Sequence, residues 1–276
     1  MAIVPNEPVL ALHGISKRFG AVQALTDVHL EVHAGEVVAL VGDNGAGKST
    51  LVKTIAGAGP ADGGVIEWCG RPVQINRPHE AQELGIATVY QDLALCDNID
   101  VVGNLFLGRE ISRAGVLDEV EMERRSRELL DTLSIRIPSV RIPIAALSGG
   151  QRQTVAIARS MLGEPKLVIL DEPTAALGVE QTAQVLDLVE RLRERGLAVI
   201  LISHNMADVK AVADTVAVLR LGRNNGVFDV AGTSQEEIIS AITGATDNAV
   251  TRRKARRDGS GHGDTSDHSH PAEAGQ

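Results

Sequence analysis

The feature that most constrains the fold of this chain is a glycine-rich stretch between an apolar run and a helical pattern. Residues 37–41 are uniformly apolar, as expected of a strand that is buried on both faces. The residues that follow are Gly42, Asp43, Asn44, Gly45, Ala46, Gly47, Lys48, Ser49 and Thr50. Leu51 and Ile55 then lie four residues apart, on one face of a predicted helix. A strand, a glycine-rich turn and a helix in this order are typical of a phosphate-binding loop.

The residue types in this loop explain how it would bind phosphate. Glycine has no Cβ, so successive backbone N–H groups can converge on an anion, and the helix N-terminus adds partial positive charge. Lys48 would reach the β- and γ-phosphates of a nucleotide, and Ser49 would offer its hydroxyl to a magnesium ion. The alternative is a glycine-rich turn that matches the pattern by chance, which the flanking strand and helix disfavour.

Charge and composition exclude several other classes of protein. The 276 residues carry a net charge of −9, whereas general nucleic-acid binders present basic surfaces. Cys69 and Cys96 form neither a disulfide framework nor a zinc spacing, which favours a reducing cytosol. The longest apolar runs, such as residues 197–202, are far shorter than the ~20 residues that cross a bilayer. We therefore expect one large domain whose role at a membrane, if it has one, depends on a partner protein.

The first 35 residues show the alternation of half-buried strands. Val28, Leu30 and Val32 alternate with polar residues. Phe19 is notable in this segment because the chain has only three Phe, one Trp and one Tyr, and a nucleotide base needs a flat apolar surface on which to stack. An ordinary core position for Phe19 is equally consistent with the sequence.

Residues 92–150 are interpreted as a helical insertion into an α/β core. This segment holds few strand signals, and residues 119–133 carry leucines on one side of a predicted helix. At its end, Ser148 is a suitable N-cap for a further helix, and Gly149 and Gly150 expose backbone N–H groups at the helix start. These groups would form a second anion site, unless the segment is a simple capped loop.

Two further apolar strands are predicted to end in residues that could act on a nucleotide. Asp171 and Glu172 follow residues 167–170, at the strand end where α/β folds gather their ligands. Asp171 could hold magnesium, and Glu172 could orient or deprotonate an attacking water. A strand that ends in acidic residues is common, so this pair alone decides little. His204 follows residues 198–202 and could contact a γ-phosphate, although a lone histidine is usually structural.

Beyond residue 246 the composition changes to charged residues, Gly, Ser and His without apolar periodicity. We therefore predict one folded domain over residues 1–246 and a disordered polar tail over residues 247–276. The tail contains a basic run at residues 252–257, which could touch anionic lipid, but a solvated run of charges is the favoured interpretation.

As a set, these motifs resemble the ATP-binding subunits of ABC transporters in their order and spacing. The motifs are residues 42–50, Gln91, residues 147–151 (LSGGQ), residues 170–173 and His204. The resemblance covers about residues 8–246 and is closest to the ribose-, xylose- and fructose-type sugar importers, in the segments YQDLALC (90–96), NLFLGRE (104–110) and TAALG (174–178). It implies a P-loop NTPase core with a RecA-like mixed sheet, an N-terminal antiparallel β subdomain and an inserted ABC-specific helical subdomain.

The resemblance also implies how the motifs would work together. Two such domains would sandwich two ATP molecules, each lying between the loop 42–50 of one subunit and Ser148, Gly149, Gly150 and Gln151 of the other. Phe19 would stack on adenine, and Gln91 and Asp171 would attend the magnesium ion beside Ser49. Glu172 would be the general base, and His204 would hold the γ-phosphate.

The partners follow from the same resemblance. Integral membrane permease subunits would receive the helical insertion and hold the chain at the cytoplasmic face of the membrane, and a substrate-binding protein would act through them. One chain holds every motif, which implies a homodimer with two competent sites. Nucleic acid is not an expected partner, because the net charge is −9. Gly178 replaces an aspartate of many ABC ATPases, a departure that concerns communication between the sites. The alternatives are another importer class or a soluble, non-transport ABC ATPase.

Overall fold

The computed structural model describes residues 7–113 and 115–245 of the 276-residue chain. One compact unit extends to Thr243, and a second begins at Gly244. The tail predicted over residues 247–276, with its basic run, lies outside the described residues. All the elements below belong to the first unit.

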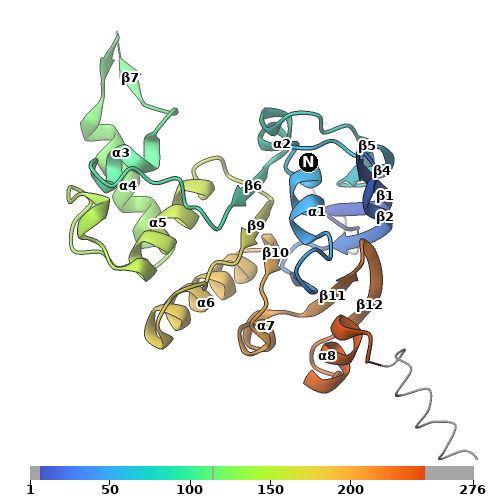
Figure 1. Cartoon of the computed structure of the whole chain (residues 1–276). Helices are drawn as coiled ribbons and strands as arrows, with labels where there is room; N and C mark the ends of the chain where they lie inside the picture. The colour runs from blue at the N-terminus through green and yellow to red at the C-terminus, as the bar shows by residue number, and fades with distance from the viewer. Residues whose placement is uncertain (1–6, 114, 246–276) are drawn as a thin grey trace, which may run out of the picture. The chain divides into compact units, whose positions relative to one another are not determined.

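A six-stranded sheet forms the centre of this unit, with the strand order β12-β11-β3-β10-β9-β6 (Figure 1). Neighbouring strands from β11 to β6 are parallel, and β12 pairs antiparallel with β11 at one edge. The strands are β3 (Val37–Val41), β6 (Ile86–Val89), β9 (Leu167–Asp171), β10 (Ala198–Ile202), β11 (Thr215–Arg220) and β12 (Arg223–Asp229). The predicted α/β core with a mixed sheet is confirmed.

The two faces of this sheet belong to different hydrophobic cores. In β3, Val37, Ala39 and Val41 pack into one core, and Val38 and Leu40 pack into the other. The first core includes side chains of the helices α5, α6, α7 and α8, and the second includes those of α1, α2 and a separate antiparallel sheet. The helices are α1 (Lys48–Ile55), α2 (Pro78–Leu84), α5 (Gly149–Met161), α6 (Val179–Glu194), α7 (Met206–Val212) and α8 (Gln235–Thr243). Burial on both faces explains the unbroken apolar sequence of β3.

The antiparallel sheet has the order β2-β1-β4-β5 and comes from the amino-terminal part of the chain. Its strands are β1 (Leu10–Phe19), β2 (Val22–Val32), β4 (Gly63–Trp68) and β5 (Arg71–Val73). Val28, Leu30 and Val32 are buried and their polar neighbours are exposed, as the alternation predicted. The expected N-terminal antiparallel β subdomain is therefore present.

The predicted insertion is mainly helical but contains a short hairpin that the sequence did not reveal. Its elements are α3 (Val101–Phe106), β7 (Ser112–Arg113), β8 (Val116–Leu117), α4 (Glu119–Thr132) and a 3-10 turn (Ile144–Ala146). The hairpin escaped prediction because two residues per strand are too few to show a periodic pattern. The apolar faces of α3 and α4 join the core that also contains α5 and α6, so the insertion shares a hydrophobic core with the sheet.

A buried asparagine fixes the loop that enters the insertion. Asn104 is fully buried, and its Oδ1 accepts from the backbone N–H of Cys96 at 2.7 Å. Its Nδ2 donates to the carbonyl oxygens of Cys96, Ile99 and Asp100 at 3.0, 3.2 and 3.0 Å. One side chain thus ties four backbone groups of this loop together. Among the described residues only Asn104 accepts the Cys96 N–H, whereas each of the three carbonyl oxygens also accepts a backbone N–H.

Replacing Asn104 with alanine should therefore destabilise the protein. The substitution leaves the Cys96 N–H without its acceptor and removes the donor that links three carbonyl oxygens, so we expect a loss of roughly 1–3 kcal/mol in the free energy of unfolding. Urea denaturation would measure it, with Asn98→Ala as the control, because Asn98 is exposed in the same loop. Equal effects of the two substitutions would contradict this role of Asn104.

Candidate functional site

The glycine-rich loop connects the carboxyl end of β3 to the first residue of α1. Gly42 and Gly47 have φ angles of 152° and 104°, in the region that favours glycine. A Cβ atom on Gly47 would lie 2.8 Å from Leu25 Cδ2 and 2.9 Å from the carbonyl oxygen of Ala24, so no side chain fits there. The loop closes around the amino end of α1, where free N–H groups and the helix dipole favour an anion.

This loop lines a cavity of about 560 Å³. Because β3, β10, β9 and β6 are parallel neighbours, the segments that follow them meet at one edge of the sheet. The lining residues are Val22, Gln23, Ala24, residues 44–50, Gln91, Asp171, Glu172, Ile202, Leu221 and Gly222. The structure therefore brings Lys48, Ser49, Gln91, Asp171 and Glu172 together from distant parts of the chain.

Lys48 lies across the mouth of the loop. Its Nζ atom donates to the carbonyl oxygens of Gly42 and Asp43, the latter at 3.0 Å. The ammonium group therefore lies beside the converging N–H groups, where it adds a full positive charge to their partial charges. This arrangement suits the terminal phosphates of a nucleotide.

The oxygen-bearing residues of the cavity fit a magnesium ion. Asp171, Ser49 and Gln91 supply a carboxylate, a hydroxyl and an amide, which are the hard oxygen ligands that Mg²⁺ prefers. Burial raises the pKa of Asp171, and the adjacent Glu172 raises it further, while nearby lysines act in the opposite direction. A cation beside Asp171 would favour its charged form.

Glu172 and His204 are in direct contact at the same edge of the sheet. His204 Nδ1 lies 2.8 Å from Glu172 Oε2; the Glu172 side chain is mostly buried, and that of His204 is 76% exposed. Glu172 has a φ of 50°, a strained conformation for a residue with a Cβ, and its N–H donates to the carbonyl oxygen of Ile202. The structure thus pairs two residues that the sequence singled out separately.

The second predicted anion site, at residues 148–151, lies apart from the glycine-rich loop of the same chain. Ser148 caps α5 with the reciprocal bonds of a capping box: its Oγ accepts from the N–H of Gln151 at 3.2 Å, and its own N–H donates to Gln151 Oε1 at 3.0 Å. Ser148 and Gln151 line a different, polar cavity beside α6, and none of residues 148–151 lines the cavity of the glycine-rich loop.

Phe19 occupies neither a core position nor the lining of the cavity. Its side chain is 55% exposed at the end of β1, so the core interpretation is wrong. Phe19 pairs with Val22 across the β1–β2 turn, and Val22 does line the cavity. Lys17 Nζ lies 5.6 Å from the centre of the Phe19 ring. Stacking of Phe19 on a base stays a prediction, and Val22 and Leu221 are lining residues that the sequence did not indicate.

Comparisons with known proteins agree with this geometry. The ABC transporter family matches residues 25–175. The fructose import ATP-binding protein FrcA of Rhizobium meliloti is 43% identical over 87% of this chain and 95% of the relative. The xylose/arabinose import ATP-binding protein XylG of Sulfolobus acidocaldarius is 44% identical over 85% of this chain and 94% of the relative. The chain belongs to the ABC transporter family.

A solved structure shows that the fold is also that of an ABC cassette. An ATP-binding cassette of an ABC transporter in its ADP conformation has a TM-score of 0.75 and 26% identity, over 90% of this chain and 98% of that one. The P-loop NTPase fold predicted from the sequence is confirmed, and family and fold together make the chain an ATP-binding ATPase. Within residues 7–113 and 115–245, no helix is both long and apolar enough to cross a membrane.

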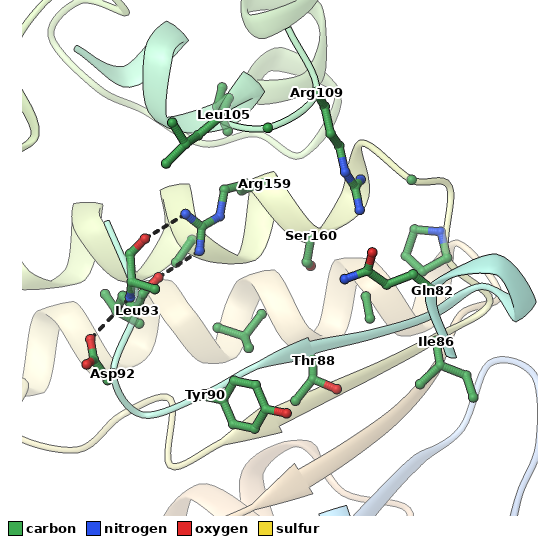
Figure 2. Close-up of a pocket in the computed structure, with 18 of the residues that line it drawn as sticks. Gln82, Ile86, Thr88, Tyr90, Asp92, Leu93, Leu105, Arg109, Arg159 and Ser160 are labelled. Carbon is green, nitrogen blue, oxygen red and sulfur yellow. Dashed lines mark hydrogen bonds between the residues drawn. The ribbon is translucent and has the colours of Figure 1, made fainter. Parts of the chain in front are cut away.

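The ABC cassette has a second cavity, of about 380 Å³, lined by the insertion, α5 and β6 (Figure 2). Arg159 of α5 donates to the carbonyl oxygens of Leu93 and Ala94, both at 2.8 Å, and burial lowers its pKa. Figure 2 shows the side chains of Arg109 and Gln82 reaching toward the same cavity from opposite sides. Arg109 is exposed, and its guanidinium has no hydrogen bond or ion pair to any described residue.

One residue missed by sequence reasoning links the turns that follow β9 and β10. Asp208 of α7 is 5% exposed and accepts from Thr174 Oγ1 at 2.6 Å and from Asn205 Nδ2 at 2.9 Å. Thr174 is two residues after Glu172, and Asn205 directly follows His204, so one buried carboxylate holds both turns. The only sequence signal was an acidic residue in the first turn of α7, a helix that was not predicted.

We expect Asp208→Ala to reduce turnover while ATP affinity changes little. Loosening the turns would misplace Glu172 relative to the nucleotide, and small misplacements cost roughly tenfold or more in rate, whereas the phosphate loop is untouched. Steady-state kinetics with nucleotide-binding measurements would separate the two effects.

A matched control for this substitution is Asp214→Ala. Asp214 accepts from the N–H of Val37 at the amino end of β3, away from the cavity. Its loss should cost stability without changing turnover per folded molecule. A fall in turnover of similar size in both variants would show that Asp208 acts only through global stability.

Proposed function

We propose that this chain is the ATP-binding and ATP-hydrolysing subunit that energises a multi-subunit ABC importer of a monosaccharide. The observation that carries the proposal is the contact of Glu172 with His204 beside a complete phosphate loop. The import ATP-binding proteins for fructose and for xylose/arabinose, similar over nearly their whole lengths, support the importer class and the sugar.

In the proposed mechanism each residue acts through the atoms it presents to the cavity. Backbone N–H groups of residues 44–49 and Lys48 Nζ bind the phosphates and offset their charge. Asp171, Ser49 and Gln91 would hold the magnesium ion that accompanies ATP and screens its phosphates. Glu172 takes a proton from the water that attacks the γ-phosphate. His204, held by Glu172 through Nδ1, would contact the γ-phosphate through its other ring nitrogen.

The proposal includes a homodimer in which each nucleotide contacts both chains. The separation of Ser148 and Gln151 from the phosphate loop of their own chain supports this arrangement. Ser148 is exposed at the start of α5, where its hydroxyl and the N–H groups of Gly149 and Gly150 could meet an anion on another chain. Closing on ATP and reopening after hydrolysis would then drive the transport cycle.

We further propose that membrane permease subunits dock at the cavity of Figure 2 and hold the cassette at the cytoplasmic face of the membrane. The cavity lies where the insertion meets the sheet, next to Gln91, so a partner bound there could sense closure of the nucleotide site. The guanidinium of Arg109, which has no partner among the described residues, suits a carboxylate on the permease. A substrate-binding protein would act through the permease, and screening sugar-loaded binding proteins for stimulation of the ATPase would identify the sugar.

Glu172→Gln tests the assignment of the general base. Glutamine keeps the shape of the side chain but cannot accept the proton at neutral pH, so ATP should bind about as well as to the parent. Turnover should fall by ~10²–10⁴-fold or more, the usual worth of general-base assistance. Uncleaved ATP should then hold two chains together, which gel filtration with ATP would show as a dimer.

Two further variants sharpen this test. Ser148→Arg, combined with Glu172→Gln, should abolish the dimer because it crowds the second half of the proposed sandwich. Glu194→Gln, an exposed carboxylate at the far end of α6, should leave turnover unchanged. Near-parental hydrolysis by Glu172→Gln would show that Glu172 is not the base.

Arg109→Glu tests the docking site. Reversal of the charge should reduce copurification with the co-expressed permease subunits and leave the ATPase activity of the isolated cassette unchanged, because Arg109 does not line the nucleotide cavity. Arg71→Glu, an exposed residue on β5, is the control and should change neither quantity. Unimpaired assembly of Arg109→Glu would place the permease elsewhere.

A further inference from the structure

An exposed leucine holds a strained backbone conformation at the edge of the nucleotide cavity. Leu221 lies in the turn between β11 and β12, with a φ of 50°, although leucine rarely adopts positive φ. Its side chain is 79% exposed and lines the cavity of the phosphate loop. The two-residue turn between Arg220 and Arg223 requires positive φ at both central positions. Leucine is an unfavourable residue there, both for its backbone conformation and for the exposure of its apolar side chain, and such strained positions cluster at functional sites.

The surrounding structure prevents this turn from relaxing. Next to Leu221, the N–H of Gly222 donates to the carbonyl oxygen of Ala46 in the phosphate loop at 3.0 Å. The carbonyl oxygen of Gly222 accepts from the N–H of Thr26 on β2 at 2.8 Å. A Cβ atom on Gly222 would lie 2.5 Å from the carbonyl oxygen of Ala24, so the turn packs directly on β2. Leu221 is therefore held at a fixed place beside the loop.

Leu221 is one of the apolar side chains in a cavity that charged and hydroxyl groups also line. Lys48 and Ser49 in the loop, with Asp171 beyond them, account for the phosphates and the metal ion. Of the remaining lining side chains, Leu221 and Val22 are apolar and largely exposed, Val22 to 66%. The part of a nucleotide that needs an apolar surface is the base with the adjoining face of the ribose.

We propose that Leu221, together with Val22, forms the wall against which the base and ribose of the bound nucleotide pack. This inference rests on the proposed function, since it assumes that the phosphate loop holds a nucleotide. The nucleotide covers the exposed leucine, and that burial offsets the strained backbone that places it there. Without nucleotide, Leu221 costs stability; with nucleotide, it adds affinity.

The two effects have opposite signs and can be measured in one variant, Leu221→Asn. Asparagine tolerates positive φ better than leucine, so the melting temperature without nucleotide should rise by about 2–4 °C. Loss of the apolar wall should weaken ADP binding by roughly three- to tenfold in calorimetry. Inorganic pyrophosphate, which has no base or ribose, should compete for the site equally well in variant and parent.

Two controls separate this role from general effects of the substitution. Leu221→Met keeps an apolar side chain and should retain the ADP affinity and the melting temperature of the parent. Glu164 also has a positive φ, of 48°, and is exposed outside the nucleotide cavity. Glu164→Asn should therefore raise the melting temperature without changing ADP affinity.

Several outcomes would overturn the inference. Unchanged ADP affinity in Leu221→Asn would show that the leucine does not contact the nucleotide. An equal loss of pyrophosphate affinity would show that the turn acts on the phosphate loop through Gly222 and not on the base. An unchanged melting temperature would show that no strain is stored at Leu221. If the parent itself binds no ADP, it is the proposed function that fails.

Discussion

The parallel pairing of the central strands is the constraint on which the site depends. Because β3, β10, β9 and β6 run in the same direction, the turns that follow them meet at one edge, and each turn contributes a different group. These groups are the phosphate loop, His204, the pair Asp171 and Glu172, and Gln91. The strands stay parallel because helices on one face and an antiparallel sheet with α1 on the other bury both sides.

Around this edge, some residues have backbone conformations or buried charges that are unfavourable on their own. Glu172 and Leu221 have positive φ angles, and burial disfavours the charged form of Asp171. Each is fixed by neighbours that belong to the rigid sheet: Glu172 through Ile202, and Leu221 through the turn at Gly222. Binding sites gain from such preorganisation because a ligand that relieves the strain or the buried charge binds more tightly.

Much of the fold was predictable because its signals are local. The unbroken apolar runs of β3, β9 and β10 predicted strands buried on both faces, and the helical periodicity of residues 180–195 predicted α6 within a residue at each end. The capping box at Ser148 was also local. By contrast, α3, α7 and the β7–β8 hairpin were missed. A helix of six or seven residues spans at most two turns and shows little 3.6-residue periodicity, and strands of two residues show no alternation.

For the site, the sequence by itself determined which candidate groups the chain carries, because each motif is contiguous in the chain. It singled out Lys48, Asp171, Glu172 and His204 together with the phosphate loop. Only the tertiary structure decided which side chains touch: that His204 contacts Glu172, that Asp208 holds both of their turns, and that Leu221 lines the cavity. These contacts join segments far apart in sequence, so they follow from strand order and packing and not from any local pattern.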